Sequence, residues 1–335
     1  MKLAIFVFIL FLATALQASN TYTVSLGADS NGDVYLLQID DVGNILKAPK
    51  KIATNAQLGG ICDCPTAIVP LGSDELSVWI VNEDQNFFRI NVDKNTFKTL
   101  SIKPIPTLKT TDENVISASQ VASPSFLASE KPTVVARAFG LTASGSPSGN
   151  NWRLIPRIDG GNDEVHVSSD GRMAVAFDTS SPEEVLYIQP LKSTGLPDGP
   201  PETLGSEKNG EGPDVSNPTP NGTRIVVWRS FDTDLLSLQV VDANTGAKVG
   251  PRKSLFKASV EEHDQSIAVD PLAHFFLYTE DGKPEGCLDH DIVMFQALDP
   301  NGNLSGKSKV LVGCDFIASE NIGDDILGID IFLNQ

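Results

Sequence analysis

The chain has 335 residues, of which 43 are acidic and 25 are basic, so its formal net charge is −18 at neutral pH. Nucleic acids and anionic membranes draw affinity from clusters of Lys and Arg, so this charge disfavours both as partners. It favours a cationic partner, a metal ion or simple solubility.

The N-terminal segment has the pattern of a signal peptide of 18 residues. Lys2 is followed by an unbroken apolar run from Leu3 to Leu12, which is too short to span a bilayer. Cleavage is predicted after Ala15 or Ala18, and no later segment has the roughly 18 consecutive apolar residues of a membrane helix. We therefore expect a secreted or periplasmic protein in which residues 19–335 form a single domain.

One phrase recurs along the rest of the chain: a β-type run followed by a turn with two glycines four residues apart. Clear copies read VLYIQPLKSTGLPDGPPETL at 185–204 and LLSLQVVDANTGAKVGPRKSL at 235–255. A degenerate copy, FFRINVDKNTFKTL, lies near residue 94. The first glycines of the other copies are Gly43, Gly145, Gly195, Gly246 and Gly302. The phrase therefore occurs six times.

A second phrase falls between copies of the first and consists of a short run, a turn and a strongly β-prone run. It reads DEVHVSSDGRMAVAF at 163–177, PDVSNPTPNGTRIVVW at 213–228 and HDQSIAVDPLAHFFLYT at 263–279. One unit is thus four short strands, and no segment keeps a helical apolar spacing for three turns. Six such units of about fifty residues predict an all-β, six-bladed β-propeller. Leucine-rich and β-helical arrays, the alternative, have shorter repeats.

The phase of the repeat predicts how the ring closes. Only about twenty residues follow the last inner-strand marker at Asp315, whereas the chain starts with outer-strand phrases. The last blade is therefore expected to be composite, built from 315–335 plus 20–55. Its inner strands should come from 315–333 and its outer strands from about 22–54, which hides two sheet edges from solvent.

The phrases VSSDGRMAVAF and NPTPNGTRIVVW resemble the repeats of TolB-like β-propellers, in which an inner strand ends in a Ser-Pro-Asp-Gly type of turn. This chain departs from that pattern where Pro is missing before Asp170 and where Asp270-Pro271-Leu272 contains no glycine. The resemblance implies the fold and no particular activity, because this scaffold serves many uses.

Four cysteines, Cys62, Cys64, Cys287 and Cys314, lie in the part of the chain that is expected to be exported. An even count in an oxidising compartment favours disulfides over zinc, for which the C-x-C spacing is unusual. The strand order puts the start of each inner strand and the loop between second and third strands on one face. We therefore expect Cys287 to pair with Cys314, while Cys62 and Cys64 either pair with each other or compete for Cys314.

No catalytic motif is present, and the G-x-S-x-G nucleophile turn is absent. The candidate binding residues are acidic groups that recur near the start of each inner strand, together with their charged neighbours: Asp63, Asp163, Glu164, His166, Asp214, Glu262, His263, Asp264 and Asp315. One interpretation is that the aspartates accept hydrogen bonds from backbone N–H groups in turns. The other is that carboxylates facing the central funnel bind a cation or a basic peptide.

Taken together, these features predict an exported, monomeric, non-catalytic binding module without a cofactor, which recognises a protein or peptide through the funnel face. The first alternative is a hydrolase or lyase that uses calcium or manganese in the funnel. The second is a structural envelope protein with no ligand.

Overall fold

The computed structural model describes residues 19–28, 32–59, 66–82, 84, 86–109, 116–120, 125–129, 137–142, 144–154, 162–178, 183–258, 267–282, 286–287, 290–320 and 326–334. The predicted signal peptide and both Cys62 and Cys64 lie outside these residues. Among the residues described, no helix is long and apolar enough to cross a membrane.

The strands of the described chain pair into six four-stranded antiparallel sheets. The first two sheets along the chain comprise β4 (Thr66–Pro70), β5 (Glu75–Val81), β6 (Asn86–Asp93) and β7 (Thr99–Lys109), then β8 (Ile116–Ala118), β9 (Ser125–Ser129), β10 (Arg137–Leu141) and β11 (Pro147–Arg153). The next two comprise β12 (Asn162–Val167), β13 (Met173–Asp178), β14 (Glu184–Pro190) and β15 (Glu202–Glu207), then β16 (Gly210–Val215), β17 (Thr223–Ser230), β18 (Leu235–Asp242) and β19 (Lys253–Lys257). The fifth comprises β20 (Ile267–Val269), β21 (Phe275–Asp281), β22 (Asp291–Leu298) and β23 (Leu304–Val312). The sixth comprises β24 (Ile326–Asn334), β1 (Thr21–Ala28), β2 (Val34–Asp40) and β3 (Ile45–Ala53).

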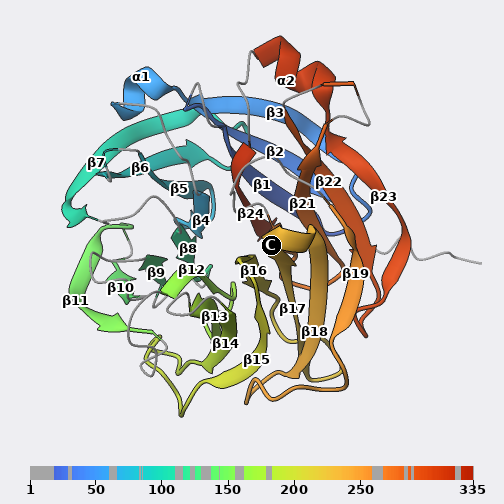
Figure 1. Cartoon of the computed structure of the whole chain (residues 1–335). Coiled ribbons are helices and arrows are strands. Elements are labelled where there is room, and N and C mark those ends of the chain that lie inside the picture. The colour runs from blue at the N-terminus through green and yellow to red at the C-terminus, as the bar shows by residue number, and fades with distance from the viewer. Residues whose placement is uncertain are drawn as a thin grey trace, which may run out of the picture.

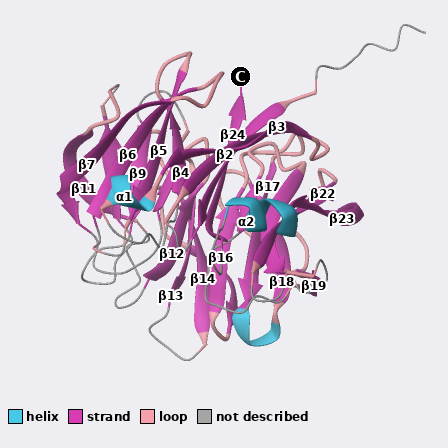
Figure 2. Cartoon of the chain, turned by 90° about the horizontal axis from the view of Figure 1, so that it is seen from above, coloured by secondary structure: helices cyan, strands magenta, loops and turns pink. Residues whose placement is uncertain are grey.

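The sheets stand around a central axis, with β8, β12, β16 and β24 innermost and β7, β11 and β23 at the outside (Figure 1). This is the architecture of a β-propeller, so the predicted all-β propeller fold is confirmed. The helical segments of the described chain are short: α1 (Asn55–Leu58), the 3-10 turn η1 (Phe231–Thr233) and α2 (Cys314–Glu320). Seen from above, the C-terminus and η1 lie on opposite faces of the ring (Figure 2).

The sixth sheet joins the two ends of the chain. Its innermost strand, β24, pairs antiparallel with β1 in a register that runs from Thr21 opposite Asn334 to Gly27 opposite Gly328. The C-terminal segment thus supplies one strand and the N-terminal segment three. The prediction that 315–333 would form two inner strands is wrong, because 314–320 form α2 and 326–334 make one continuous strand.

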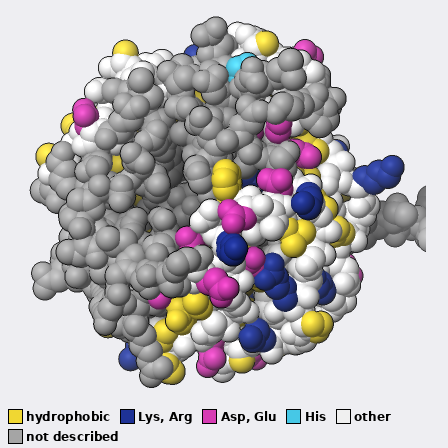
Figure 3. Space-filling view, in the orientation of Figure 1, with side chains coloured by type: hydrophobic (Ala, Val, Ile, Leu, Met, Phe, Trp, Pro, Cys, Tyr) yellow, Lys and Arg dark blue, Asp and Glu magenta, His cyan; other side chains and the backbone are white. Residues whose placement is uncertain are grey.

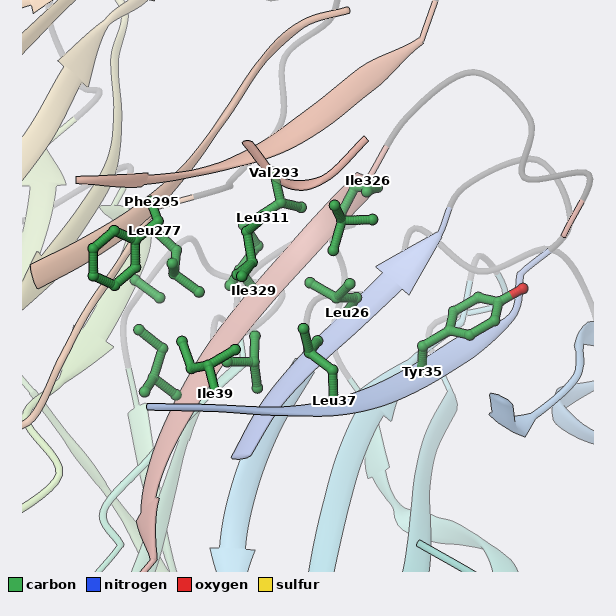
Figure 4. Close-up of a cluster of buried hydrophobic side chains, with 14 of the residues drawn as sticks. Leu26, Tyr35, Leu37, Ile39, Leu277, Val293, Phe295, Leu311, Ile326 and Ile329 are labelled. Carbon is green, nitrogen blue, oxygen red and sulfur yellow. The ribbon is translucent and has the colours of Figure 1, made fainter. Parts of the chain in front are cut away.

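The core lies between neighbouring sheets. Figure 4 shows Leu26, Leu37 and Ile39 of the sixth sheet facing Leu277 and Phe295 of the fifth, all of them almost fully buried. Because each sheet packs on both faces, its middle strands are nearly continuous apolar runs instead of alternating ones. The outermost strands are different: β3 exposes most of its side chains and carries lysines and a proline, which discourage pairing with other strand edges.

The first glycine of the repeat is required by contact between sheets. Gly43 has a φ of +72°, and a Cβ there would lie 2.7 Å from Phe295 Cδ2 of the fifth sheet. The second glycine has a different role: Gly250 has a φ of +75°, but a Cβ there would have no heavy atom within 4 Å. The first glycine therefore serves both the turn and the packing, while the second serves the turn alone.

We expect Gly43→Ala to destabilise the protein more than the matched variant Gly250→Ala. Both place an alanine at a left-handed backbone angle, which costs about 1–2 kcal/mol. Only Gly43→Ala also forces a methyl group into a packed ring, at a further cost of about 1–3 kcal/mol. Urea unfolding of the two variants measures the difference, and equal losses would show that the Gly43 contact with Phe295 is unimportant.

The predicted disulfide between Cys287 and Cys314 is present, with the two Cα atoms 5.5 Å apart. Cys287 belongs to the loop between β21 and β22, and Cys314 begins α2 on the way to the last inner strand. The bond confirms that these two kinds of connection share one face. We call this face, where the inner strands begin, the start face; it includes η1, Cys287 and Cys314, and the opposite side is the end face.

Candidate functional site

Each of the six innermost strands has one residue at an equivalent position in the ring. Three hydrogen bonds between neighbouring strands define the equivalence: Val167 N–H donates to Ser117 Oγ at 2.9 Å, Val269 N–H to Asp214 Oδ2 at 2.6 Å, and Ile68 N–H to Asp330 Oδ2 at 2.6 Å. In each pair the acceptor side chain and the donating N–H come from successive sheets. We call the residue directly before each of these three donors an axial residue, and we give the same name to the equivalent residue of each other inner strand. The six axial residues are Ala67, Ser117, His166, Asp214, Ala268 and Asp330.

Each axial carboxylate satisfies the N–H groups of two sheets. Asp214 Oδ1 accepts from Val215 N–H of its own strand at 2.7 Å, while Oδ2 accepts from the next sheet. Asp330 repeats the arrangement, with Ile331 N–H at 2.7 Å on Oδ1. An innermost strand has no neighbour on its axial side, so its N–H groups there need other acceptors.

This geometry explains why axial residues with an acceptor side chain alternate with axial alanines in successive sheets from Asp214 to Ala67. A carboxylate has two oxygens and can serve two N–H groups, so the next sheet needs no acceptor of its own. Ala67 and Ala268, both almost fully buried, follow Asp330 and Asp214 in the ring. The axial aspartates are therefore links between sheets: they accept hydrogen bonds from backbone N–H groups of adjacent inner strands and not from those of turns.

His166 takes the axial position of the third sheet. Its Nδ1 lies 3.7 Å from Asp214 Oδ1, and the two side chains are only 13% and 14% exposed. Its Nε2 is fully buried and has no hydrogen-bond partner among the described residues. Together with Asp330, Ser117, Thr66 and Gln120, the two side chains line a small cavity on the axis.

Burial governs the ionisation of this group. Removal from water raises the pKa of Asp214 to about 7, although its two backbone N–H partners oppose the rise. Burial also raises the pKa of Asp330 to about 8, and the charge of Asp214 adds to the effect. Burial has the opposite sign for a base and lowers the pKa of His166 to about 4, so the imidazole is neutral at pH 7.

These shifts predict that the folded state is most stable in mild acid. The folded protein holds protons on Asp214 and Asp330 more tightly than the unfolded chain does, so stability rises as the pH falls from about 8 toward 4. His166 opposes this between pH 6.5 and about 4, where only the unfolded state takes up its proton. The effect of the two carboxyls outweighs that of the one imidazole, so the stability of the folded state rises overall as the pH falls. We expect the Tm to be higher at pH 5.5 than at pH 8, and a Tm that rises toward pH 8 would refute the assignment.

The structure brings together only two of the residues predicted from sequence, His166 and Asp214. Asp163 and Glu164 lie earlier in β12, where Asp163 pairs with Phe177, three residues before the axial position. Asp315 is exposed in the first turn of α2, away from the inner strands. The predicted residues outside the described part of the chain are Asp63, Glu262, His263 and Asp264.

Two of the four polar axial residues were not among the predicted ones, Ser117 and Asp330. Asp330 lies in the phrase GIDIFL, in which a polar residue interrupts an otherwise apolar strand. This interruption is the signal in the sequence that could have marked Asp330.

The turn that resembles the TolB-like pattern also joins sheets. Asp170 accepts two hydrogen bonds from the buried Arg224 of the next sheet, at 3.0 and 2.7 Å. In the fifth sheet Asp270 accepts from the N–H groups of Leu272 and His274 instead. The turns differ, as the missing glycine suggested, but in both an aspartate at the end of the inner strand accepts hydrogen bonds.

Among the residues that the structure describes, no three His, Cys, Asp or Glu side chains are placed to hold one metal ion. An open cleft does lie on the start face between the third and fourth sheets. It is lined by Glu183, Ser206, Glu207, Lys208, Ser230, Asp232 and Thr233. Acidic and basic side chains intermingle over the described part of the face seen in Figure 3.

No protein-family model matches the chain, and no curated protein matches it in sequence. Solved structures do resemble it along most of its length. The crystal structure of a nidogen/laminin complex matches 94% of this chain and 99% of that chain, with a TM-score of 0.59 and 10% identity. A protein from Lactobacillus plantarum matches 93% and 99%, with a TM-score of 0.51 and 13% identity. The SapL1 lectin in complex with alpha methyl fucoside matches 87% and 95%, with a TM-score of 0.51 and 12% identity.

The fold is that of a β-propeller. At these identities the similarity concerns the fold alone, because propellers of one shape serve unrelated functions.

Proposed function

We propose that this chain is an exported, non-catalytic binding module, a six-bladed propeller closed by the composite blade of β24 and β1–β3, which recognises a protein or peptide with its start face. The observation that carries the proposal is the closed axis. The space between His166, Asp214 and Asp330 admits the centre of one water-sized group, about 10 Å³. The space between these side chains is too small to hold a substrate.

The axial carboxylates are also committed to structure. All four of their oxygens accept backbone N–H groups that join successive sheets. Because its oxygens are used to join the sheets, such a carboxylate is better suited to a structural role than to the role of a nucleophile or a metal ligand. Recognition then falls to the faces of the ring, where loops carry the variable side chains.

The cleft between the third and fourth sheets is a recess on the start face. Its lining combines the carboxylates of Glu183 and Asp232 with the hydroxyls of Ser206 and Thr233, and includes Lys208. Such groups offer hydrogen-bond acceptors to a polar or basic segment of a partner. The Cys287–Cys314 disulfide on the same face supports export, because disulfides persist in oxidising compartments.

The test is capture of partners from the extracellular or envelope fraction of the native host, compared between variants. Asp232→Arg and Ser206→Arg place a large cation in the cleft, whereas Asp198→Arg places the same group on an exposed turn of the end face. We expect the first two to lose the captured protein and the third to retain it. Loss with Asp198→Arg alone, or a stoichiometric calcium or manganese ion in the purified protein, would overturn the proposal, the latter in favour of a metal-dependent hydrolase or lyase.

A further inference from the structure

The axial cavity is polar and small. Its lining includes the hydroxyls of Thr66 and Ser117, the carboxylates of Asp214 and Asp330, the amide of Gln120 and the imidazole of His166. A site that holds one water needs about 10–15 Å³ for its centre and two to four polar partners. The cavity has more than enough polar partners for one water, and its volume of about 10 Å³ just reaches the required size.

His166 provides an independent indication of what the cavity binds. A neutral imidazole carries one N–H donor and one acceptor nitrogen. Nδ1 is the nitrogen nearer the Asp214 carboxylate, at 3.7 Å, so the proton belongs on Nδ1. Nε2 is then an acceptor, fully buried and without a partner among the described residues. Leaving a buried acceptor without a donor is unfavourable, so a donor is required at this nitrogen.

The neighbouring groups cannot provide that donor themselves. No polar group of the described residues lies within hydrogen-bond distance of Nε2, and the nearby N–H groups of Val215 and Val269 already donate to Asp214. The Gln120 amide donates to the carbonyl oxygen of Ile331 at 2.7 Å. A small molecule with two donor hydrogens fits the remaining need.

We propose that one water molecule occupies the axial cavity, donating one hydrogen to His166 Nε2 and the other to an oxygen of the axial carboxylates. The water links the third sheet, whose axial residue is a histidine, to the sheets that carry Asp214 and Asp330. A metal ion would satisfy Nε2 as well, but the described residues do not bring three metal-binding side chains to one point. The inference goes beyond the proposed function, since it concerns the closure of the axis and not the partner.

The experiment is a crystal structure of the full protein grown with manganese, at a resolution that shows ordered water. We expect one peak about 3 Å from His166 Nε2 that refines as water and gives no anomalous signal at the manganese edge. A peak with anomalous signal, or no peak at all, overturns the proposal. Either result leaves the partner-capture experiment unaffected, so the two proposals fail separately.

A pair of variants tests the role of the nitrogen. His166→Gln keeps an amide that can bond to the water, whereas His166→Leu has a similar size and no polar atom. We expect His166→Leu to lower the Tm by roughly 2–5 °C and His166→Gln to lower it by less. Equal losses, or a larger loss in His166→Gln, would show that Nε2 has no bound partner to lose.

Discussion

Removal of residues 326–335 is expected to leave the protein insoluble or unfolded. The deletion takes away β24 alone, which pairs with β1 along eight residues and buries Ile329, Ile331 and Phe332 between sheets. Its loss exposes the inner edge of β1 and removes Asp330, the acceptor for Ile68 N–H of the next sheet. An unpaired edge strand invites aggregation, and an open ring loses contacts on both sides of the gap. Solubility and cooperative thermal melting measure the result, and a deletion protein that melts at the parent Tm would contradict it.

A circular permutant provides the control. Thr21 lies opposite Asn334, so a short linker can join residues 19 and 334. New ends can be opened between Ser193 and Thr194, at the exposed tip of the turn that follows β14. The permutant keeps every strand and breaks only the order of the chain. We expect it to fold, so failure of both proteins would mean that the closing strand is not the cause.

The fold could be predicted because its signals are local and repeated. The turn at Gly43 and its counterparts need a left-handed glycine, and that requirement recurs with the period of the blade. A glutamine in the third strand carries further information of the same kind. Gln189 donates to the carbonyl oxygen of Gly199 at 3.1 Å, and Gln239 donates to that of Gly250 at 3.2 Å. The glutamine therefore belongs to the repeat along with the glycines.

The candidate site could be predicted only in part, because turn lengths differ between sheets. Val167 pairs with Ala174, seven residues later, whereas Val215 pairs with Val226, eleven residues later. Counting from the aspartates therefore aligns Asp163 with Asp214, although His166 is the true counterpart. Spacing along the chain also cannot show that Asp315 begins a helix, since the repeat favours a strand there. Equivalence across the axis depends on pairing between sheets, which the sequence does not display.

The axial aspartates give the second large effect. Asp214→Ala and Asp330→Ala each leave two buried N–H groups without an acceptor, and each such group costs about 1–3 kcal/mol. We expect each variant to lose about 2–6 kcal/mol of unfolding free energy, a large share of the stability of an ordinary domain. The control Asp315→Ala, on exposed helix, should change it by about 0.5 kcal/mol or less. Urea unfolding at pH 7 measures all three.

The alternation of acceptors yields a sharper test at Ala268, which occupies the same axial position as Asp214 in the next sheet. A carboxylate placed there has no N–H group to accept, because Val269 already donates to Asp214 and Ile331 to Asp330. Ala268→Asp therefore buries a charge without partners beside two existing carboxylates, and we expect it to destabilise the protein although the residue type is the one found at the neighbouring axial positions. In the double variant with Asp214→Ala, the new carboxylate can accept the freed Val269 N–H of its own strand but lies one sheet too far along the ring to reach Val215 N–H, so it should restore only part of the stability. Recovery of the parent free energy of unfolding in that double variant would show that any axial carboxylate suffices, and that the alternation of aspartate and alanine has no structural cause.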